Sequence, residues 1–367
     1  MNKQGRMDNG SRSEAPRACT KDQAVGISSR SDGWHTELTL PCDGHQHLIA
    51  AGIIKDPVQA DHCFAAEWIE QRSWWFRRLI MPEPGWSGCD TVELVLESLD
   101  VHADIFFNGA WIGHQASAHY PFRADVKPML TDGENELLIR LTSGLETVCD
   151  ADLAELDFAV STEAGNGCPE RGDKRRAFVR KPTYVYGWDW CPRIGTCGIV
   201  KKAWIEYHQK LAIRDVQVET RQLRPNNGQS VTAVDADLHV MVTIDNLDLL
   251  ATTDADVSVA ISHGDDEVLA LQTDVLLRSG INHIDFDLTV EQARLWWPNG
   301  MGAQDMYRVV VQMTHKGRQI RYPDILTGIR TIRLDTGRID TARRRFSLIV
   351  NDVPVFCKGA DWIPADS

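Results

Sequence analysis

The chain has 367 residues, of which 43% are hydrophobic, and its formal net charge at pH 7 is −13. An acidic balance of this size disfavours nucleic acids and anionic membranes as partners, because both are negatively charged. No apolar run approaches the ~18 residues that a membrane-spanning helix needs. We therefore expect a globular protein of about two to three domains that handles a neutral ligand.

Residues 1–32 are rich in Ser, Arg, Asp and Gly and have almost no aliphatic side chains, so we expect a disordered tail. They contain no hydrophobic segment typical of a secretory signal. From residue 33 to residue 207, short β-prone segments alternate with Gly, Pro and Asp turns, which predicts a β-sandwich. Its clearest feature is a hairpin, with strands at 101–107 and 110–114 around the Asn108-Gly109 turn. The other expected elements are strands at 35–40, 73–80, 91–97 and 135–141, and short helical segments at 47–54 and 67–72.

Residues 208–330 show regular alternation of apolar and polar side chains, which predicts a second, immunoglobulin-like sandwich. We expect a packed corner at Trp296-Trp297-Pro298. Residues 345–350 and 354–359 predict a further hairpin around Asn351-Asp352. The strands expected in the second sandwich are 238–244, 257–261, 284–290 and 307–313.

Residues 180–195 gather aromatic side chains around one carboxylate, in the order Trp188, Asp189, Trp190. Indole faces stack on the C–H faces of sugar rings, and a carboxylate accepts hydrogen bonds from paired hydroxyls, so the trio could line a small-ligand pocket. The alternative is a structural corner in which Asp189 forms a salt bridge with Arg180 or Arg193. Both interpretations stay open on the trio alone.

Three other features predict no chemistry of their own. The basic cluster at 171–176 lies in a long loop, and we expect it to be a solvated face. The nine cysteines include no Cys-x-x-Cys pair, which favours reduced thiols in a cytoplasmic protein. His45 and His47 have no third ligand nearby in the sequence, so we expect neither a metal nor a cofactor.

Five blocks, in order and with matching spacing, resemble the β-mannosidases of glycoside hydrolase family 2. The resemblance covers roughly residues 33 to 367. In three positions the chain departs from the family pattern: Cys42 and Cys191 stand where glycine is usual, and Asp361 stands where asparagine is usual. The five blocks are 40–48, 104–113, 180–199, 295–300 and 356–366.

The resemblance implies a fold that is mainly β. A jelly-roll β-sandwich at 33–207 would precede the immunoglobulin-like sandwich at 208–330, and 331–367 would begin a catalytic (β/α)8 barrel that the chain does not complete. It implies a retaining exo-β-mannosidase, which uses two carboxylic acids. Asn135-Glu136 opens a sandwich strand, so we reject it as the acid/base pair and expect no catalytic residue in this chain, which should be inactive alone.

The resemblance also implies a binding role for the Trp-Asp-Trp block. Asp189 would accept hydrogen bonds from mannose hydroxyls, Trp188 and Trp190 would form the pocket walls, and Arg180 would orient Asp189. Trp362 and Asp366, near the first barrel strand, are weaker candidates. The partners considered are a β-mannoside oligosaccharide and a second copy in a homodimer.

Two other functions remain open. One is another exo-glycosidase of family 2, a β-glucosaminidase or a β-galactosidase. The other is a carbohydrate-binding β-sandwich protein without catalytic activity.

Overall fold

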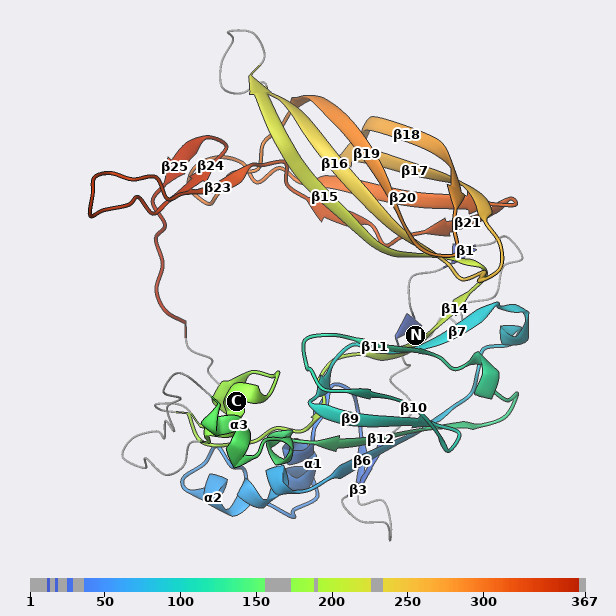
Figure 1. Cartoon of the computed structure of the whole chain (residues 1–367), viewed down its shortest axis with the longest axis vertical. Coiled ribbons are helices and arrows are strands. Elements are labelled where there is room, and N and C mark those ends of the chain that lie inside the picture. The colour runs from blue at the N-terminus through green and yellow to red at the C-terminus, as the bar shows by residue number, and fades with distance from the viewer. Residues whose placement is uncertain are drawn as a thin grey trace. The chain divides into compact units, whose positions relative to one another are not determined.

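The computed structural model describes residues 12–13, 17–18, 25–28, 36–155, 173–187, 191–225 and 234–362. Over these residues the protein is mainly β, which confirms the predicted fold class (Figure 1). The chain divides into two compact units, and the division falls between His208 and Gln209. Strand β1 belongs with the unit that contains Gln209–Trp362.

The first unit is a β-sandwich with a large apolar core and a smaller apolar cluster that contains Val185 and Tyr186. One sheet has the strand order β10-β9-β12-β6-β3-β4, and the other has the order β11-β7-β14-β2. Val92, Leu94 and Leu96 alternate along β7 and enter the core, where Trp74 and Phe76 of β6 are almost fully buried. A small sheet, β5-β13-β8, completes the unit. The strands are β2 (Arg17–Ala18), β3 (Val25–Ser28), β4 (Thr36–Leu38), β5 (Cys42–Asp43), β6 (Trp74–Ile80), β7 (Thr91–Leu96), β8 (Leu99–Asp100), β9 (His102–Phe107), β10 (Ala110–Gln115), β11 (Phe122–Asp125), β12 (Asn135–Thr142), β13 (Gly198–Ile199) and β14 (Ala203–His208).

Short helices connect these strands. The first begins at Gly44 because the side chain of Asp43 accepts a hydrogen bond from the N–H of His45, with 2.7 Å between the two atoms. The helices are α1 (Gly44–Ala50), α2 (His62–Ala66) and α3 (Asp150–Ala154), and the 3-10 turns are η1 (Glu67–Gln71), η2 (Trp86–Gly88), η3 (Lys127–Met129), η4 (Leu145–Thr147), η5 (Lys174–Phe178) and η6 (Thr183–Tyr186).

Three short strands lie in the described part of residues 1–32, the segment for which the sequence predicts a disordered tail. Strand β3 pairs with both β4 and β6, β2 pairs with β14, and β1 (Arg12–Ser13) pairs with β21 of the second unit. Each short strand adds backbone hydrogen bonds to a sheet that already exists, which does not require a long apolar run. The rest of 1–32 lies outside the described residues.

The second unit is a sandwich built from longer strands. One sheet has the order β15-β16-β19, and the other has the order β1-β21-β20-β17-β18, with β22 also paired to β20. Strand β16 alternates strictly between buried and half-buried residues, so Val240 and Val242 enter the core. The strands are β15 (Leu211–Pro225), β16 (Val234–Asn246), β17 (Thr253–His263), β18 (Asp266–Leu277), β19 (Gly280–Ala293), β20 (Tyr307–His315), β21 (Arg318–Arg321) and β22 (Ile325–Thr327).

Two predicted features of the second unit are confirmed. Trp296 forms a packed corner: its N–H donates to the carbonyl of Ile329 at 2.9 Å, and the Arg330 guanidinium lies 4.5 Å from its ring centroid. Asn351 and Asp352, with φ of 50° and 62°, form the expected hairpin turn. Residues 356–362 form neither helix nor strand, and the described residues contain no closed barrel. The hairpin belongs to an antiparallel sheet of β23 (Ile332–Asp335), β24 (Ser347–Val350) and β25 (Val353–Val355).

Candidate functional site

Of the six predicted site residues, the structure describes two. Arg180 is exposed, and its carbonyl oxygen accepts a hydrogen bond from the N–H of Ala118 at 2.9 Å. Trp362 is in the other unit and is 88% exposed. The described part of the site is therefore the chain on either side of the Trp-Asp-Trp segment, residues 173–187 and 191–198, which we call the stems. The remaining four residues lie outside the described residues: Trp188, Asp189, Trp190 and Asp366.

Hydrogen bonds hold the two stems together close to the Trp-Asp-Trp segment. The N–H of Ile194 donates to the carbonyl of Val185, 2.8 Å away, and both residues are buried. Turn η6 ends at Tyr186, and the next residue, Gly187, has a φ of 101°, a conformation that favours glycine. Nη1 of Arg176 donates to the Gly187 carbonyl at 2.7 Å. The backbone that enters the segment and the backbone that leaves it are thus both fixed.

The position of Arg176 corrects the expectation that the basic cluster at 171–176 is a solvated face. Arg176 is only 6% exposed and serves the stem through its bond to Gly187. A run of like charges predicts exposure on average, but one member can turn inward when a buried carbonyl needs a donor. Residues 171 and 172 lie outside the described residues.

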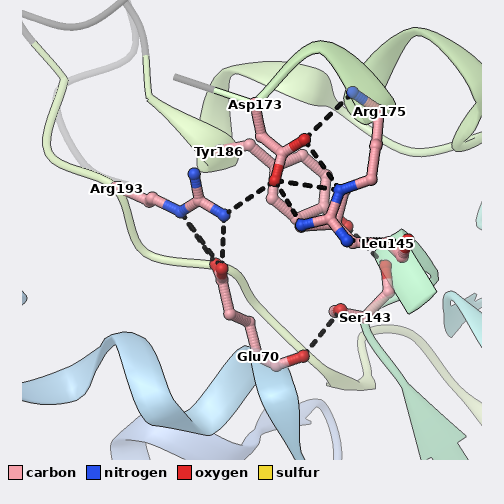
Figure 2. A network of polar contacts seen from close by, with 7 residues as sticks. All are labelled: Glu70, Ser143, Leu145, Asp173, Arg175, Tyr186 and Arg193. Carbon is pink, nitrogen blue, oxygen red and sulfur yellow. Dashed lines mark hydrogen bonds and ion pairs between the residues drawn. The ribbon is translucent and has the colours of Figure 1, made fainter. Parts of the chain in front are cut away.

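An ion pair anchors the second stem to the sandwich (Figure 2). Nε of Arg193 lies 3.1 Å and 3.2 Å from the two carboxylate oxygens of Glu70, and Nη2 also contacts that carboxylate. The same Nη2 lies 3.3 Å from Oδ2 of Asp173 on the first stem. The Arg193 and Glu70 side chains are 11% and 5% exposed, so the pair is almost removed from water. Arg193 therefore ties together the two stems and turn η1.

Asp173 is itself held by a second arginine. Its Oδ1 caps turn η5 by accepting from the N–H of Arg175 at 3.0 Å, and its Oδ2 accepts from Nη2 of Arg175 at 2.6 Å. Burial would raise the pKa of Asp173, but the hydrogen bonds and charge of Arg175 lower it below its usual value. Burial would likewise lower the pKa of Arg193, but its bonds to Glu70 raise it. Both groups are thus held in their charged forms.

Tyr186 links the first stem to the same network through Ser143. Its ring is fully buried, and its hydroxyl donates to the carbonyl of Ser143, as Figure 2 shows. The Ser143 hydroxyl in turn donates to the backbone carbonyl of Glu70 at 2.8 Å. Burial, followed by the charge of Asp100, raises the pKa of Tyr186, so the phenol stays protonated and can donate. Glu70 is thus held both by its carboxylate and by its backbone.

A second buried ion pair attaches the first stem to strand β8. The Lys181 ammonium pairs with Asp100, and the two side chains are 0% and 6% exposed. Nζ of Lys181 also donates to the carbonyl of Thr196 at 2.6 Å, while the Thr196 hydroxyl donates to Oδ2 of Asp100 at 2.6 Å. Each charge therefore has additional polar partners, which buried ions require.

Two glycines allow the second stem to lie against its neighbours. A Cβ on Gly195 would lie 2.4 Å from Oε2 of Glu70, and a Cβ on Gly198 would lie 2.2 Å from the carbonyl oxygen of Cys42. No side chain fits at either position without movement. The glycines therefore explain why the second stem can approach both the ion pair and strand β5.

The sequence analysis singled out the stretch that contains some members of this network, but it did not predict the network. Arg193, Tyr186 and Lys181 lie inside the stretch that was singled out, although their structural roles were not predicted. Glu70 lies 123 residues before Arg193, and Asp173 lies 20 residues before it. No short-range pattern marks a partner at such a separation, so only the fold could reveal the carboxylates.

One group of described residues has metal-ligand geometry, away from the stems. Ligand atoms of Glu93, Glu206 and His208 lie within 4.8 Å of one another. Nη1 of Arg123 already lies 2.9 Å from Oε2 of Glu206 and 3.4 Å from Oε2 of Glu93. A divalent cation would have to displace this guanidinium, so we interpret the group as an ion-pair cluster.

Comparison with known domain families covers most of the chain. The family described as "Glycosyl hydrolase 2 galactose-binding domain-like" matches residues 20–201, and "Glycosyl hydrolases family 2" matches residues 211–330. The chain belongs to glycoside hydrolase family 2. In the described residues, no helix is both long and apolar enough to cross a membrane.

The proteins similar to this chain include several that are named as β-mannosidases. Beta-mannosidase B of Emericella nidulans is 29% identical over 92% of this chain, and a probable beta-mannosidase of Caenorhabditis elegans is 30% identical over 89%. The crystal structure of a beta-D-mannosidase from Dictyoglomus thermophilum matches with a TM-score of 0.80 and 27% identity, covering 94% of this chain and 40% of that one. The chain spans 37% and 35% of the lengths of the two curated relatives.

Proposed function

We propose that the protein carrying this chain is a retaining exo-β-mannosidase that hydrolyses terminal non-reducing β-D-mannose residues. The support is that relatives named β-mannosidase match almost the whole chain, across both sandwiches. A retaining mechanism needs two carboxylic acids about 5 Å apart. We assign neither of them to this chain, whose part in the reaction is to bind the sugar, and we expect the chain alone to be inactive.

The observation that supports a binding role is the way the stems are held. Buried ionic and hydrogen-bonded contacts fix both ends of the Trp-Asp-Trp segment, at Gly187 and at Arg193. Specific binding requires that the residues in contact with the ligand be held in place by their surroundings. We propose that Asp189 accepts hydrogen bonds from mannose hydroxyls and that Trp188 and Trp190 stack on the sugar.

The other candidate residues have lesser roles in this proposal. The exposed Arg180 would orient Asp189, and the exposed Trp362 would offer an indole face to the sugar. Asp366 would add a second acceptor. No metal or cofactor is part of the proposed site.

Two other functions compete with this one. The fold is shared with the structure of an exo-chitosanase from Amycolatopsis orientalis at 15% identity and a TM-score of 0.64, so the fold does not select the sugar. A non-catalytic carbohydrate-binding protein would use the same stems without hydrolysis. The similarity to β-mannosidases favours the first proposal over both.

A panel of aryl glycosides separates the three functions. The protein encoded by the complete gene is assayed on aryl β-mannoside, β-galactoside and β-glucosaminide, with mannose binding measured in parallel. We expect kcat/KM to be highest for the mannoside. A preference for either of the other glycosides would contradict the proposed substrate, and sugar binding without hydrolysis of any of them would contradict the enzyme.

The assembly we propose is a homodimer, and the compartment is the reducing cytoplasm. Cys42 and Cys197 are free thiols inside the first sandwich. Burial raises the pKa of Cys42 to about 12 and raises that of Cys197 as well, so both remain protonated and unreactive.

A further inference from the structure

Strand β18 is the last strand of its sheet, and no described strand pairs with the outer side of its backbone. It pairs with β17 from Leu269 to Leu277, in unbroken register, and the sheet order stops there (Figure 1). The unpaired side of such a strand presents a row of N–H and C=O groups. These groups form a ready template for another strand.

The side chains of β18 do little to protect this edge. Between Leu269 and Leu277 the only charged residue is Asp274, and there is neither proline nor lysine. Leu271 is 44% exposed and Leu276 is 69% exposed. Natural edge strands usually carry charges, prolines or bulges that prevent pairing with another chain.

The end strands of the opposite sheet are protected in this way. Strand β15 is interrupted by two register shifts, at Ile213/Asp215 and Thr220/Gln222. It also carries five charged residues: Arg214, Asp215, Glu219, Arg221 and Arg224. Strand β19 places Asp285 and Asp287 on its exposed positions. From Leu269 to Leu277, β18 has no register shift and a single charge; its one shift falls before Leu269, beside Asp266 and Glu267. This contrast within one sandwich singles out β18.

We propose that β18 is the interface of the homodimer, and that two copies pair antiparallel through this strand about a two-fold axis at Gln272. In an antiparallel pair, directly opposite residues share a face of the sheet. An axis at Gln272 places Leu269 opposite Val275 of the second copy and Leu271 opposite Thr273. In the continuous sheet, the exposed side chain of Leu271 would be covered by Thr273 of the second copy, on the same face of the sheet.

This register also separates the charges. Asp274 would lie opposite Ala270 of the second copy, so the two Asp274 residues would be offset by four residues. At ~3.4 Å per residue the offset is roughly 14 Å, which exceeds the Debye length of about 8 Å at physiological ionic strength. Repulsion between the copies is therefore small, and the same surface patch serves both partners, as a two-fold interface requires.

The mass of the protein in solution tests this interface without depending on any glycosidase activity. Light scattering after size exclusion is expected to give the dimer mass for the wild type and the monomer mass for Leu271→Lys. Ile281→Lys is the matched control: Ile281 is 57% exposed on β19, and we expect that variant to remain dimeric. Circular dichroism checks that each variant folds. A monomeric wild type, or a dimer that Leu271→Lys leaves intact, would overturn the proposal.

Cysteine cross-linking tests the register. Gln272→Cys places two thiols directly opposite each other across the axis, so mild oxidation is expected to give a covalent dimer above the wild-type background. Ala270→Cys, on the same strand and the same face, leaves its two thiols four residues apart and is expected to stay at background. Cross-linking of Ala270→Cys but not of Gln272→Cys would overturn the proposed axis.

Discussion

The guanidinium of Arg193 lies against the carboxylate of Glu70, with Nε 3.1 Å from Oε1, although 123 residues separate them in the sequence. This contact attaches the stem that follows the Trp-Asp-Trp segment to turn η1 of the first sandwich. Both side chains are nearly buried, and Glu70 is the nearer of the two carboxylates that compensate the charge of Arg193, the other being Asp173.

Glu70→Ala is expected to lower the free energy of unfolding by about 3 kcal/mol, because the buried charge of Arg193 would keep only Asp173, which it shares with Arg175. Urea unfolding, monitored by the fluorescence of the tryptophans in the core of the first unit, measures the loss in free energy of unfolding. The matched control is Glu136→Ala, which breaks the pair with Arg77 on β6, where the side chains are 37% and 38% exposed. That variant should lose less than about 1 kcal/mol. Equal losses in the two variants would show that Glu70 contributes no more than a surface charge.

Gly198→Ala tests the close approach of the second stem to β5. The added Cβ would meet the Cys42 carbonyl at 2.2 Å and Cα of Asp43 at 2.7 Å, both of them backbone atoms that cannot rotate away. We expect a loss of about 1–3 kcal/mol, as for other overpacked sites. Gly88→Ala is the control, because no atom lies within 4 Å of its added Cβ. The account of the stem fails if thermal unfolding gives the same midpoint for both variants.

The ion-pair cluster on β14 predicts a pH dependence. His208 faces Glu206 at 3.0 Å and Glu93 at 3.4 Å, and Arg123 contacts the same two carboxylates. Burial would lower the pKa of His208, but the two carboxylates raise it. Its contribution to stability is therefore fully present below the unfolded pKa of about 6.5 and is lost as the pH rises through the raised folded pKa.

We therefore expect His208→Gln to remove more stability at pH 6 than at pH 9, measured as the difference between wild type and variant in urea unfolding. A difference that does not change with pH would contradict the raised pKa. For Glu206 the dependence of stability on pH has the opposite sign. Its pKa is lowered to about 2, because the bonds to His208, Arg123 and Trp204 outweigh burial. Its contribution is present above the unfolded pKa and is lost as the pH falls towards about 2.

Much of the fold could be predicted from local pattern. The Asn108-Gly109 turn predicted the hairpin of β9 and β10, and the strict alternation of apolar and polar residues predicted β16. Strand β15 was not predicted, because two bulges interrupt its alternation. Strand β18 was not predicted either, because an edge strand exposes apolar residues on both faces and loses the alternating signal.

The site was less predictable than the fold. The stretch at 180–195 contained Tyr186 and Arg193, but their partners Ser143 and Glu70 come from other parts of the sandwich. Glu70 lies in a short 3-10 turn and resembles any surface glutamate in the sequence. Its burial follows only from tertiary packing, which no local pattern encodes.

The central claim is that this family 2 chain presents Asp189 to a β-mannoside. The most direct measurement is kcat/KM for an aryl β-mannoside with the protein from the complete gene, comparing wild type with Asp189→Ala. The control is Asp61→Ala, an exposed aspartate whose side chain caps no helix. We expect Asp189→Ala to lower kcat/KM by at least ~10²-fold, on the order of 2.7 kcal/mol, and Asp61→Ala to leave it unchanged. Wild-type kinetics in Asp189→Ala would contradict the claim.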